Sequence, residues 1–254
     1  MPAETSLDAM TWTQLRDRLE AACGRAVALL PIGSTEPHGP HLALSADVVI
    51  SVETARRAAA RLADRGLQAI VLPALPYTVT EFSKDFPGCI GLSRATALAL
   101  ITEVCREALR QGFSAVCLVN SHLEPAHLET LREAARLVSG ETGRPVLFPD
   151  KTRKRWAALL TEEFRSGACH AGRYETSLVM AARPALVDEQ ARRALPANPT
   201  SIGHKIKEGV RTFRDAGSDL AYFGDPAAAT SREGEETFET LAAMVETAVL
   251  ESLA

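Results

Sequence analysis

Carboxylates and imidazoles gather in three short stretches of this 254-residue chain. The first stretch, residues 33–47, reads GSTEPHGPHLALSAD and contains Glu36, His38 and Asp47. Such oxygen and nitrogen donors bind divalent zinc or manganese, and the prolines and glycines around them favour a turning loop. The pattern therefore predicts a metal site in this loop. In the alternative interpretation, Asp47 only begins a helix, and His38 and His41 are surface residues.

The second stretch, residues 120–125, reads NSHLEP and contains His122 and Glu124. Pro125 suits the first position of a helix, so both side chains are expected in a turn between a strand and that helix. Glu124 could alternatively be a carboxylate that interacts only with the helix dipole. The spacing from His122 to the next histidine is not His-Glu-x-x-His, so a zinc-protease helix is not predicted.

The third stretch, residues 169–177, reads CHAGRYETS and contains His170 and Glu175. Gly172 and its small neighbour allow the backbone to approach a site closely. An imidazole with an ordinary pKa of about 6.5 can transfer protons near neutrality, so His170 is a candidate acid–base group. Alternatively, either side chain caps or braces the helix that follows.

Apolar strands alternate with amphipathic helices in the elements that must position these stretches. This alternation predicts an α/β domain with a parallel sheet, in which the first two stretches follow the carboxyl ends of strands, where ligands bind. The expected strands are 25–31, 68–73, 114–120 and 144–148. The expected helices are 11–22, 48–65, 93–112, 125–140 and 232–253.

Residues 150–167 predict one further helix, capped by Asp150. Its inward side chains are expected to be Trp156, Leu159, Leu160 and Phe164. A basic cluster lies on the same segment, at Lys151, Arg153, Lys154 and Arg155. We interpret this cluster as a solvated face or a contact for a substrate anion, because the rest of the chain has no basic stripe typical of nucleic-acid binding. The lone His204 is interpreted as structural or peripheral.

Composition favours a globular protein with a small-molecule partner. Hydrophobic residues make up 46% of the chain and the net charge is -4, which gives no general attraction to nucleic acid or membranes. The five cysteines form no close pair and fit a reducing compartment, and residues 1–6 lack the pattern of a signal peptide. We therefore predict one cytoplasmic domain over residues 1–254.

Five segments together resemble the creatininase (creatinine amidohydrolase) family, and they occur in family order over nearly the whole chain. The segments are 33–47, Phe86–Gly88, 120–124, 170–177 and 223–226. The resemblance implies a three-layer α/β/α fold with a mostly parallel central sheet. It also implies a homo-oligomer, which in this family is commonly a hexamer. It also implies two divalent ions, zinc and/or manganese, with iron as a further option.

The resemblance also implies roles for individual residues. The family's ligand positions fall on Glu36, His38, Asp47, His122 and Glu124. Asp47 matches the residue that bridges the two ions, and Glu124 and His170 match groups that act on water and substrate. Glu175 matches a second-shell residue or an alternative ligand. Thr80 falls where creatininase has a substrate-contacting serine, and Leu123 falls on an aromatic substrate-binding position.

These implied roles predict a metal-dependent hydrolase that cleaves a linear or cyclic amide C–N bond in a small molecule with metal-activated water. Creatinine itself is not the expected substrate, because Leu123 and Ser166 stand where creatininase carries aromatic residues. A formamide deformylase of flavin or deazaflavin biosynthesis and a peptidase of mycofactocin maturation are alternative enzymes on the same fold. A non-catalytic, metal-stabilised binding or assembly protein is a third alternative, and phosphate-ester hydrolysis ranks lower without a phosphate-binding glycine loop.

Overall fold

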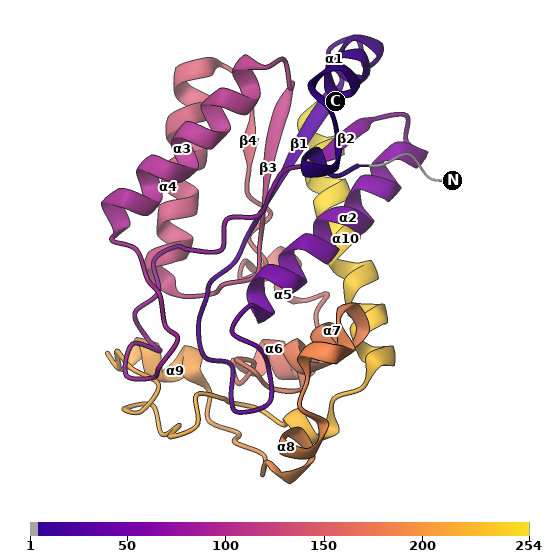
Figure 1. The fold of residues 1–254 in the computed structure, drawn as a ribbon. Coiled ribbons are helices and arrows are strands. Elements are labelled where there is room, and N and C mark those ends of the chain that lie inside the picture. Colours follow the sequence, from indigo (N-terminus) through magenta and orange to yellow (C-terminus); the bar gives the residue numbers. More distant parts are fainter. Residues whose placement is uncertain (1–4, 254) are drawn as a thin grey trace.

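A computed structural model describes residues 5–253 of the chain. Its elements alternate as predicted up to the fourth strand (Figure 1). The strands are β1 Ala26–Ile32, β2 Gln68–Val71, β3 Ala115–Asn120 and β4 Val146–Leu147. The helices flanking them are α1 Trp12–Ala21, α2 Ala46–Asp64, α3 Arg94–Arg110, α4 Pro125–Thr142 and α10 Ser231–Leu253. The remaining elements are η1 Leu7–Ala9, α5 Lys154–Ala157, α6 Glu162–Ser166, α7 Arg173–Ala182, η2 Pro184–Leu186, α8 Glu189–Ala194, α9 Ile202–Lys207 and η3 Pro226–Ala228.

The four strands form one parallel sheet in the order β2-β1-β3-β4. Side chains of β1 alternate between the two faces because successive residues of a strand point to opposite sides. Ala28 and Leu30 pack with α3 and α4, whereas Val27 and Leu29 pack with α2 and α10. The sheet is thus the middle layer of a three-layer α/β/α fold, as predicted.

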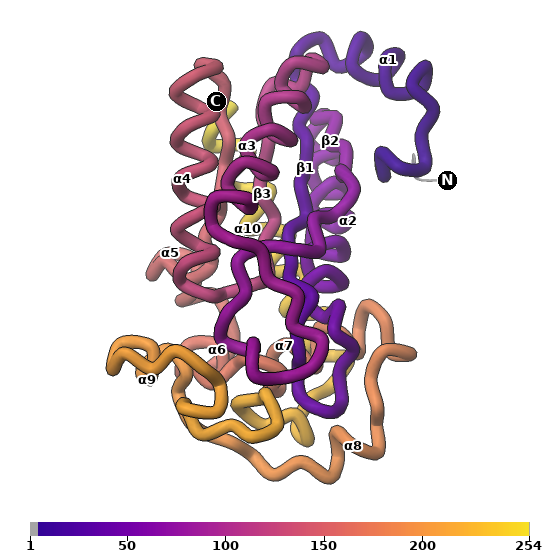
Figure 2. The backbone as a smooth tube through the Cα atoms, turned by 60° about the vertical axis from the view of Figure 1, so that its left-hand side comes forward, coloured from indigo at the N-terminus to yellow at the C-terminus, as the bar shows by residue number. Residues whose placement is uncertain are grey.

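The strand order creates a crevice at the carboxyl ends of β1 and β3. The chain passes from β1 to β2 on one side and returns to β3 on the other, which is the switch point where open α/β sheets bind ligands. Their register pairs Ile32 with Asn120, so the loop after β1 and the turn after β3 begin side by side. Figures 1 and 2 place α6 to α9 beyond this edge of the sheet.

The prediction of one continuous helix over residues 150–167 is wrong. The structure has two short helices, α5 and α6, and the Thr161 hydroxyl starts the second by accepting a hydrogen bond from the Phe164 backbone N–H. Asp150 caps neither helix, since its carboxylate accepts hydrogen bonds from Thr152 and Arg132. Leu159, predicted to point inward, is 57% exposed in the resulting turn.

Within residues 5–253, every helix is too short or too polar to cross a bilayer. The predicted lack of a signal peptide depends partly on residues 1–4, which lie outside the described residues. The predicted extent of the domain over residues 1–254 stays a prediction.

Helix α10 approaches α7 so closely at Gly234 that a Cβ there would overlap the carbonyl oxygen of Ser177. We expect Gly234→Ala to lower the free energy of unfolding by about 2 kcal/mol, because α10 must move outward. Gly140→Ala in α4 is the matched control, since a Cβ there meets no atom within 4 Å. The control should be neutral or stabilising by about 0.5 kcal/mol, from helix propensity alone. Urea unfolding would measure both changes, and equal values for the two variants would contradict the close approach.

Candidate metal and catalytic site

The loop after β1 places Glu36 and His38 at the crevice, and the first turn of α2 adds Asp47. Gly33 permits this arrangement, because a Cβ there would overlap the backbone of α2. His38 Nδ1 donates to the Glu36 carbonyl oxygen at 3.0 Å, since a carbonyl can only accept. His38 Nε2 lies 3.4 Å from Asp47 Oδ1 and is the nitrogen left to bind a cation.

His122, on the other side of the crevice, is held in the same way, but with the roles of its two ring nitrogens exchanged. Its Nε2 donates to the Val79 carbonyl oxygen at 3.0 Å. Its Nδ1 then lies 2.8 Å from Glu36 Oε1 and 3.2 Å from Asp47 Oδ2. Asp47 therefore lies between two imidazoles, with one carboxylate oxygen facing each of them.

Glu175, from the first turn of α7, completes the group around His38. Its Oε2 lies 3.6 Å from His38 Nε2 and accepts a hydrogen bond from the Ala171 N–H at 2.7 Å. Ala171 adopts a φ of 51°, a conformation that L-residues other than asparagine and aspartate rarely take. The backbone is thus held in an uncommon turn that aims an N–H at this carboxylate.

Two sets of ligand atoms near Asp47 are close enough to hold an ion. One is Glu36, Asp47 and His122, and the other is His38, Asp47 and Glu175. A third set, Glu36, His38 and His170, overlaps them. These side chains come from the loops after β1 and β3, from the first turns of α2 and α7, and from the loop before α7, and they are nearly all buried, so their hydration has been lost and must be replaced.

The charges of this site favour bound cations. Burial by itself would lower the pKa of His38, yet Asp47 and Glu175 raise it to about 10. The pKa of His122 is raised well above its usual value in the same way, by Glu36 and Asp47 against the effect of burial. Protons on these imidazoles compensate the buried carboxylates, and divalent ions that displaced the protons would compensate them more fully.

Glu124 lies beside the two sets rather than within them. Its Oε2 accepts hydrogen bonds from the backbone N–H groups of Glu81 at 2.7 Å and Phe82 at 3.2 Å. The same oxygen is 3.8 Å from His122 Nε2, the nitrogen that faces away from Asp47. Burial raises the pKa of Glu124. Among residues 5–253, the three sets of close ligand atoms do not include it, and its role as a metal ligand stays a prediction.

His170 lines the open side of the site. Its Nε2 donates to the Pro37 carbonyl oxygen at 3.0 Å, and its ring contacts His38 and Phe213 at centroid distances of 4.4 and 4.3 Å. Burial and the neighbouring His38 lower the pKa of His170 to about 4. The imidazole is therefore neutral at pH 7 and keeps Nδ1 as a proton acceptor.

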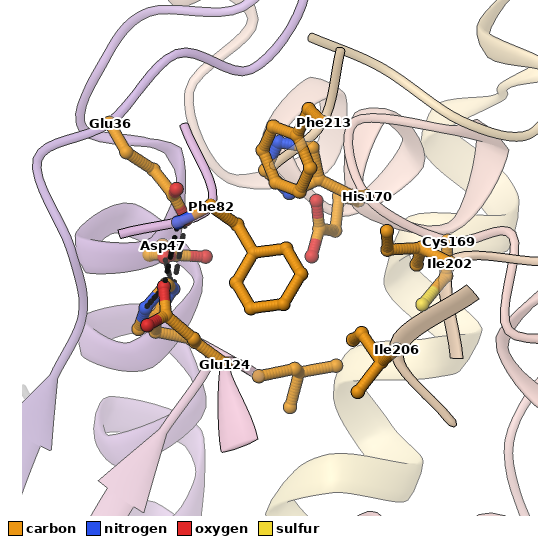
Figure 3. Close-up of a pocket in the computed structure, with 12 residues that line it drawn as sticks. Glu36, Asp47, Phe82, Glu124, Cys169, His170, Ile202, Ile206 and Phe213 are labelled. Atoms are coloured by element: carbon orange, nitrogen blue, oxygen red, sulfur yellow. Dashed lines mark hydrogen bonds and ion pairs between the residues drawn. The ribbon is translucent and has the colours of Figure 1, made fainter. Parts of the chain in front are cut away.

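A cavity opens onto these residues (Figure 3). Glu36, Asp47 and Glu124 lie on one side of it, its polar side. Its apolar lining, called the apolar wall below, is formed by Phe82, Leu123, Ile202, Ile206 and Phe213, and Ile202 and Ile206 lie across the cavity from the carboxylates. The cavity thus joins the two sets of ligand atoms to an apolar surface that a small molecule can contact.

A family model described as creatinine amidohydrolase matches residues 8–249. The chain belongs to the creatininase family. The mycofactocin precursor peptide peptidase of Mycolicibacterium smegmatis is 30% identical over 84% of this chain and 79% of the relative. The creatinine amidohydrolase of Pseudomonas putida is 27% identical over 70% of this chain and 72% of that relative. A crystal structure of creatininase matches 98% of both chains with a TM-score of 0.78 and 23% identity, which confirms the predicted fold.

The structure of this creatininase-family protein brings eight of the nine predicted site residues together in or beside the cavity, from all three stretches. The residues are Glu36, His38, Asp47, His122, Leu123, Glu124, His170 and Glu175. Thr80 lies apart: its hydroxyl is 2.7 Å from that of Ser34, and both residues are buried. Its contact with substrate stays a prediction. His38 and His41 are buried, so the interpretation of these two as surface residues is wrong.

Sequence reasoning missed most of the apolar wall. It gave no role to Phe82 and Phe213, and it did not detect α9 with Ile202 and Ile206. Ser201 accepts a hydrogen bond from the His204 N–H and caps α9, and a capping serine before isoleucines four apart was the available signal. Nothing in the sequence indicated that this short helix covers the site.

Lys151 corrects another prediction. The sequence predicts a solvated face or a contact for a substrate anion, but the Lys151 side chain is buried and its Nζ lies 5.9 Å from the centre of the Tyr174 ring. Burial lowers its pKa, against the opposing effect of Glu175 and Asp47. Lys151 is buried because its positive charge is attracted to the buried carboxylates of Glu175 and Asp47.

A network of buried polar groups orients His122. Asn120 accepts a hydrogen bond from the His122 backbone N–H at 3.2 Å and donates its amide to the His122 carbonyl oxygen at 2.6 Å. Asn120 is also 2.9 Å from His127 Nε2, and His127 Nδ1 is 2.7 Å from the Thr78 hydroxyl. Because every member has a partner, the network fixes the turn after β3.

The buried His41 makes stability depend on pH. Burial and then His38 lower its pKa from 6.5 to about 4, so the unfolded chain binds more protons than the folded one between these values. Stability contributed by this group is therefore present above pH 6.5 and is lost as the pH falls to about 4, by about 3 kcal/mol. We expect metal-free His41→Gln to lose less stability than the native protein over this interval, as measured by urea unfolding.

The exposed His204 supplies the control for this measurement. His204→Gln should keep the pH dependence of the native protein. A His41→Gln curve that stays parallel to the native curve from pH 6.5 to 4 would show that His41 titrates normally.

Proposed function

We propose that the protein is a metal-dependent hydrolase that cleaves an amide C–N bond in a small molecule. The observation that carries this proposal is the position of Asp47 between His38 and His122, each of which faces a second carboxylate. Glu36 and His122 would hold one divalent ion, His38 and Glu175 the other, and Asp47 would bridge them. Glu124 remains the alternative to Glu175 on the second ion.

Zinc and manganese fit the oxygen and imidazole donors of this site, with iron as a further option. Solved creatininases include a variant described as Zn-Zn type and a form described as Mn, which supports this choice of metals. Bound in this way, two divalent ions would supply Lewis acidity that polarises an amide carbonyl and makes water nucleophilic near neutral pH.

His170 is the residue that we propose to move the proton. The neutral ring donates Nε2–H to Pro37 and keeps Nδ1 free to accept a proton from the attacking water. The protonated ring can then donate that proton to the departing nitrogen. The lowered pKa favours return of the proton, because partial burial and the neighbouring His38 disfavour the imidazolium.

Glu124 is proposed to orient the attacking water. Backbone N–H groups of Glu81 and Phe82 hold one of its oxygens, so the carboxylate has a fixed direction beside His122. A carboxylate with a raised pKa can also share a proton with the reacting groups.

The substrate is proposed to be a small non-peptide amide, in line with the name of the creatinine amidohydrolase relative and with a solved creatininase variant complexed with creatine. A peptide-processing peptidase is the second candidate. The mycofactocin precursor peptide peptidases favour it, because they match more of the chain at higher identity. Formamide deformylation and a non-catalytic binding role remain untested predictions, as do the homo-oligomeric state, hexameric by resemblance, and the cytoplasmic location.

Metal content and turnover measured together test the proposal. We expect protein reconstituted with zinc or manganese to hold about two ions per chain and to hydrolyse members of a panel of cyclic amides, linear amides and short peptides. His170→Ala should keep both ions and lose at least about 100-fold in kcat/KM. Two bound ions with no hydrolysis across the panel would instead favour the binding-protein alternative.

The isosteric variants Glu175→Gln and Glu124→Gln separate the two roles proposed for carboxylates. Glu175→Gln should reduce the metal content to about one ion per chain, because it removes a charged ligand from the His38 side of the site. Glu124→Gln should keep both ions and lower kcat. Elemental analysis of both proteins measures the difference, and the reverse pattern would assign Glu124 as the ligand.

A further inference from the structure

The apolar wall of the cavity, defined above, is built by segments distant in sequence. Phe213 packs against Phe82 at a centroid distance of 6.1 Å and against Phe223 at 5.6 Å. Ile202 and Ile206 of α9 pack against the same cluster. Because these side chains pack against one another, the apolar wall is a packed surface and not a set of isolated exposed residues.

Helix α9 is tied to the catalytic side of the molecule. The Gly203 N–H donates to the Gly167 carbonyl oxygen at 3.4 Å, three residues before His170. A side chain at Gly167 would overlap the Ser201 hydroxyl, and the φ of 79° at Gly167 also favours glycine. These contacts hold Ile202 and Ile206 one helical turn apart over the cavity.

The charge of the cavity is confined to its polar side. Figure 3 shows Glu36, Asp47 and Glu124 on one side, and Ile202 and Ile206 across the cavity from them. Within the described chain, the residues lining this cavity include neither lysine nor arginine. A charged group lying against the apolar wall would therefore lose its hydration without gaining a partner.

We infer that the enzyme selects amides whose group next to the C–N bond is uncharged and apolar, with Ile206 and Phe213 as specificity-determining residues. This inference rests on the proposed function, since it assumes that the amide lies at the polar side. The apolar group then lies against Ile202, Ile206, Phe82 and Phe213. Each methylene that the wall removes from water should improve kcat/KM by about 4-fold.

Two pairs of amides of matched shape test the inference. The first pair varies the acyl side of the C–N bond, and the second pair varies the amine side. The first compares 4-methylpentanamide with succinamate, and the second compares N-(3-methylbutyl)acetamide with N-acetyl-β-alanine. In each pair a branched apolar end replaces a carboxylate of similar size. We expect the apolar member of at least one pair to have a kcat/KM at least about 10-fold higher with the native, metal-loaded enzyme.

Ile206→Lys should reverse this preference, because its ammonium would give the carboxylate a partner. Ile90→Lys is the matched control: Ile90 is 50% exposed and does not line the cavity, so this variant should behave as the native enzyme. Circular dichroism and metal content check that both variants fold. Binding of each amide to the His170→Ala protein, followed by ligand-observed NMR, gives a readout that does not require turnover.

The outcomes separate the inference from the proposed function. Equal or faster hydrolysis of the carboxylate member in both pairs would overturn the inference and leave the hydrolase proposal intact. Preferential binding of the apolar amides with no hydrolysis of any of them would support the inference and count against the hydrolase. A preference that Ile206→Lys leaves unchanged would overturn the role of the wall.

Discussion

The carboxylate of Asp47, buried between two imidazoles, is the interaction on which the rest of the site depends. Removing a carboxylate from water costs several kcal/mol unless positive charge compensates it, and here two further carboxylates share the same interior. His38 and His122 are fixed by carbonyl groups on their outer nitrogens, so their inner nitrogens can only face Asp47. The side chains themselves thus form two groups of ligand atoms that share Asp47, which is the basis of the proposed two-ion site.

The sheet makes this arrangement possible. In the register of β1 against β3, Ile32 pairs with Asn120 at the switch in strand order. The two loops that carry the carboxylates and imidazoles therefore begin next to each other. The first turn of α2 packs against Gly33, the residue after β1, and places Asp47 at the site. The layers on each side of the sheet carry ordinary apolar packing, and the positive φ of Ala171 lies in the turn that holds Glu175 at the site.

The sequence predicted the parts of this structure that follow from local pattern. Four apolar runs separated by amphipathic helices led to the sheet and to its carboxyl edge. The break between α5 and α6 was not predictable in this way, because one threonine hydroxyl competes with a continuing helix. The position of Lys151 depends on carboxylates distant in the sequence, and the isoleucines of α9 face the cavity through tertiary contacts, so neither follows from periodicity.

Crystals grown with manganese and measured for anomalous scattering would test the central claim most directly. The account predicts two anomalous peaks about 3.5 to 4 Å apart, one on each side of the Asp47 carboxylate. The first should lie among Glu36, Asp47 and His122, and the second beside His38. Anomalous density that nowhere lies within bonding distance of Asp47 would contradict the account.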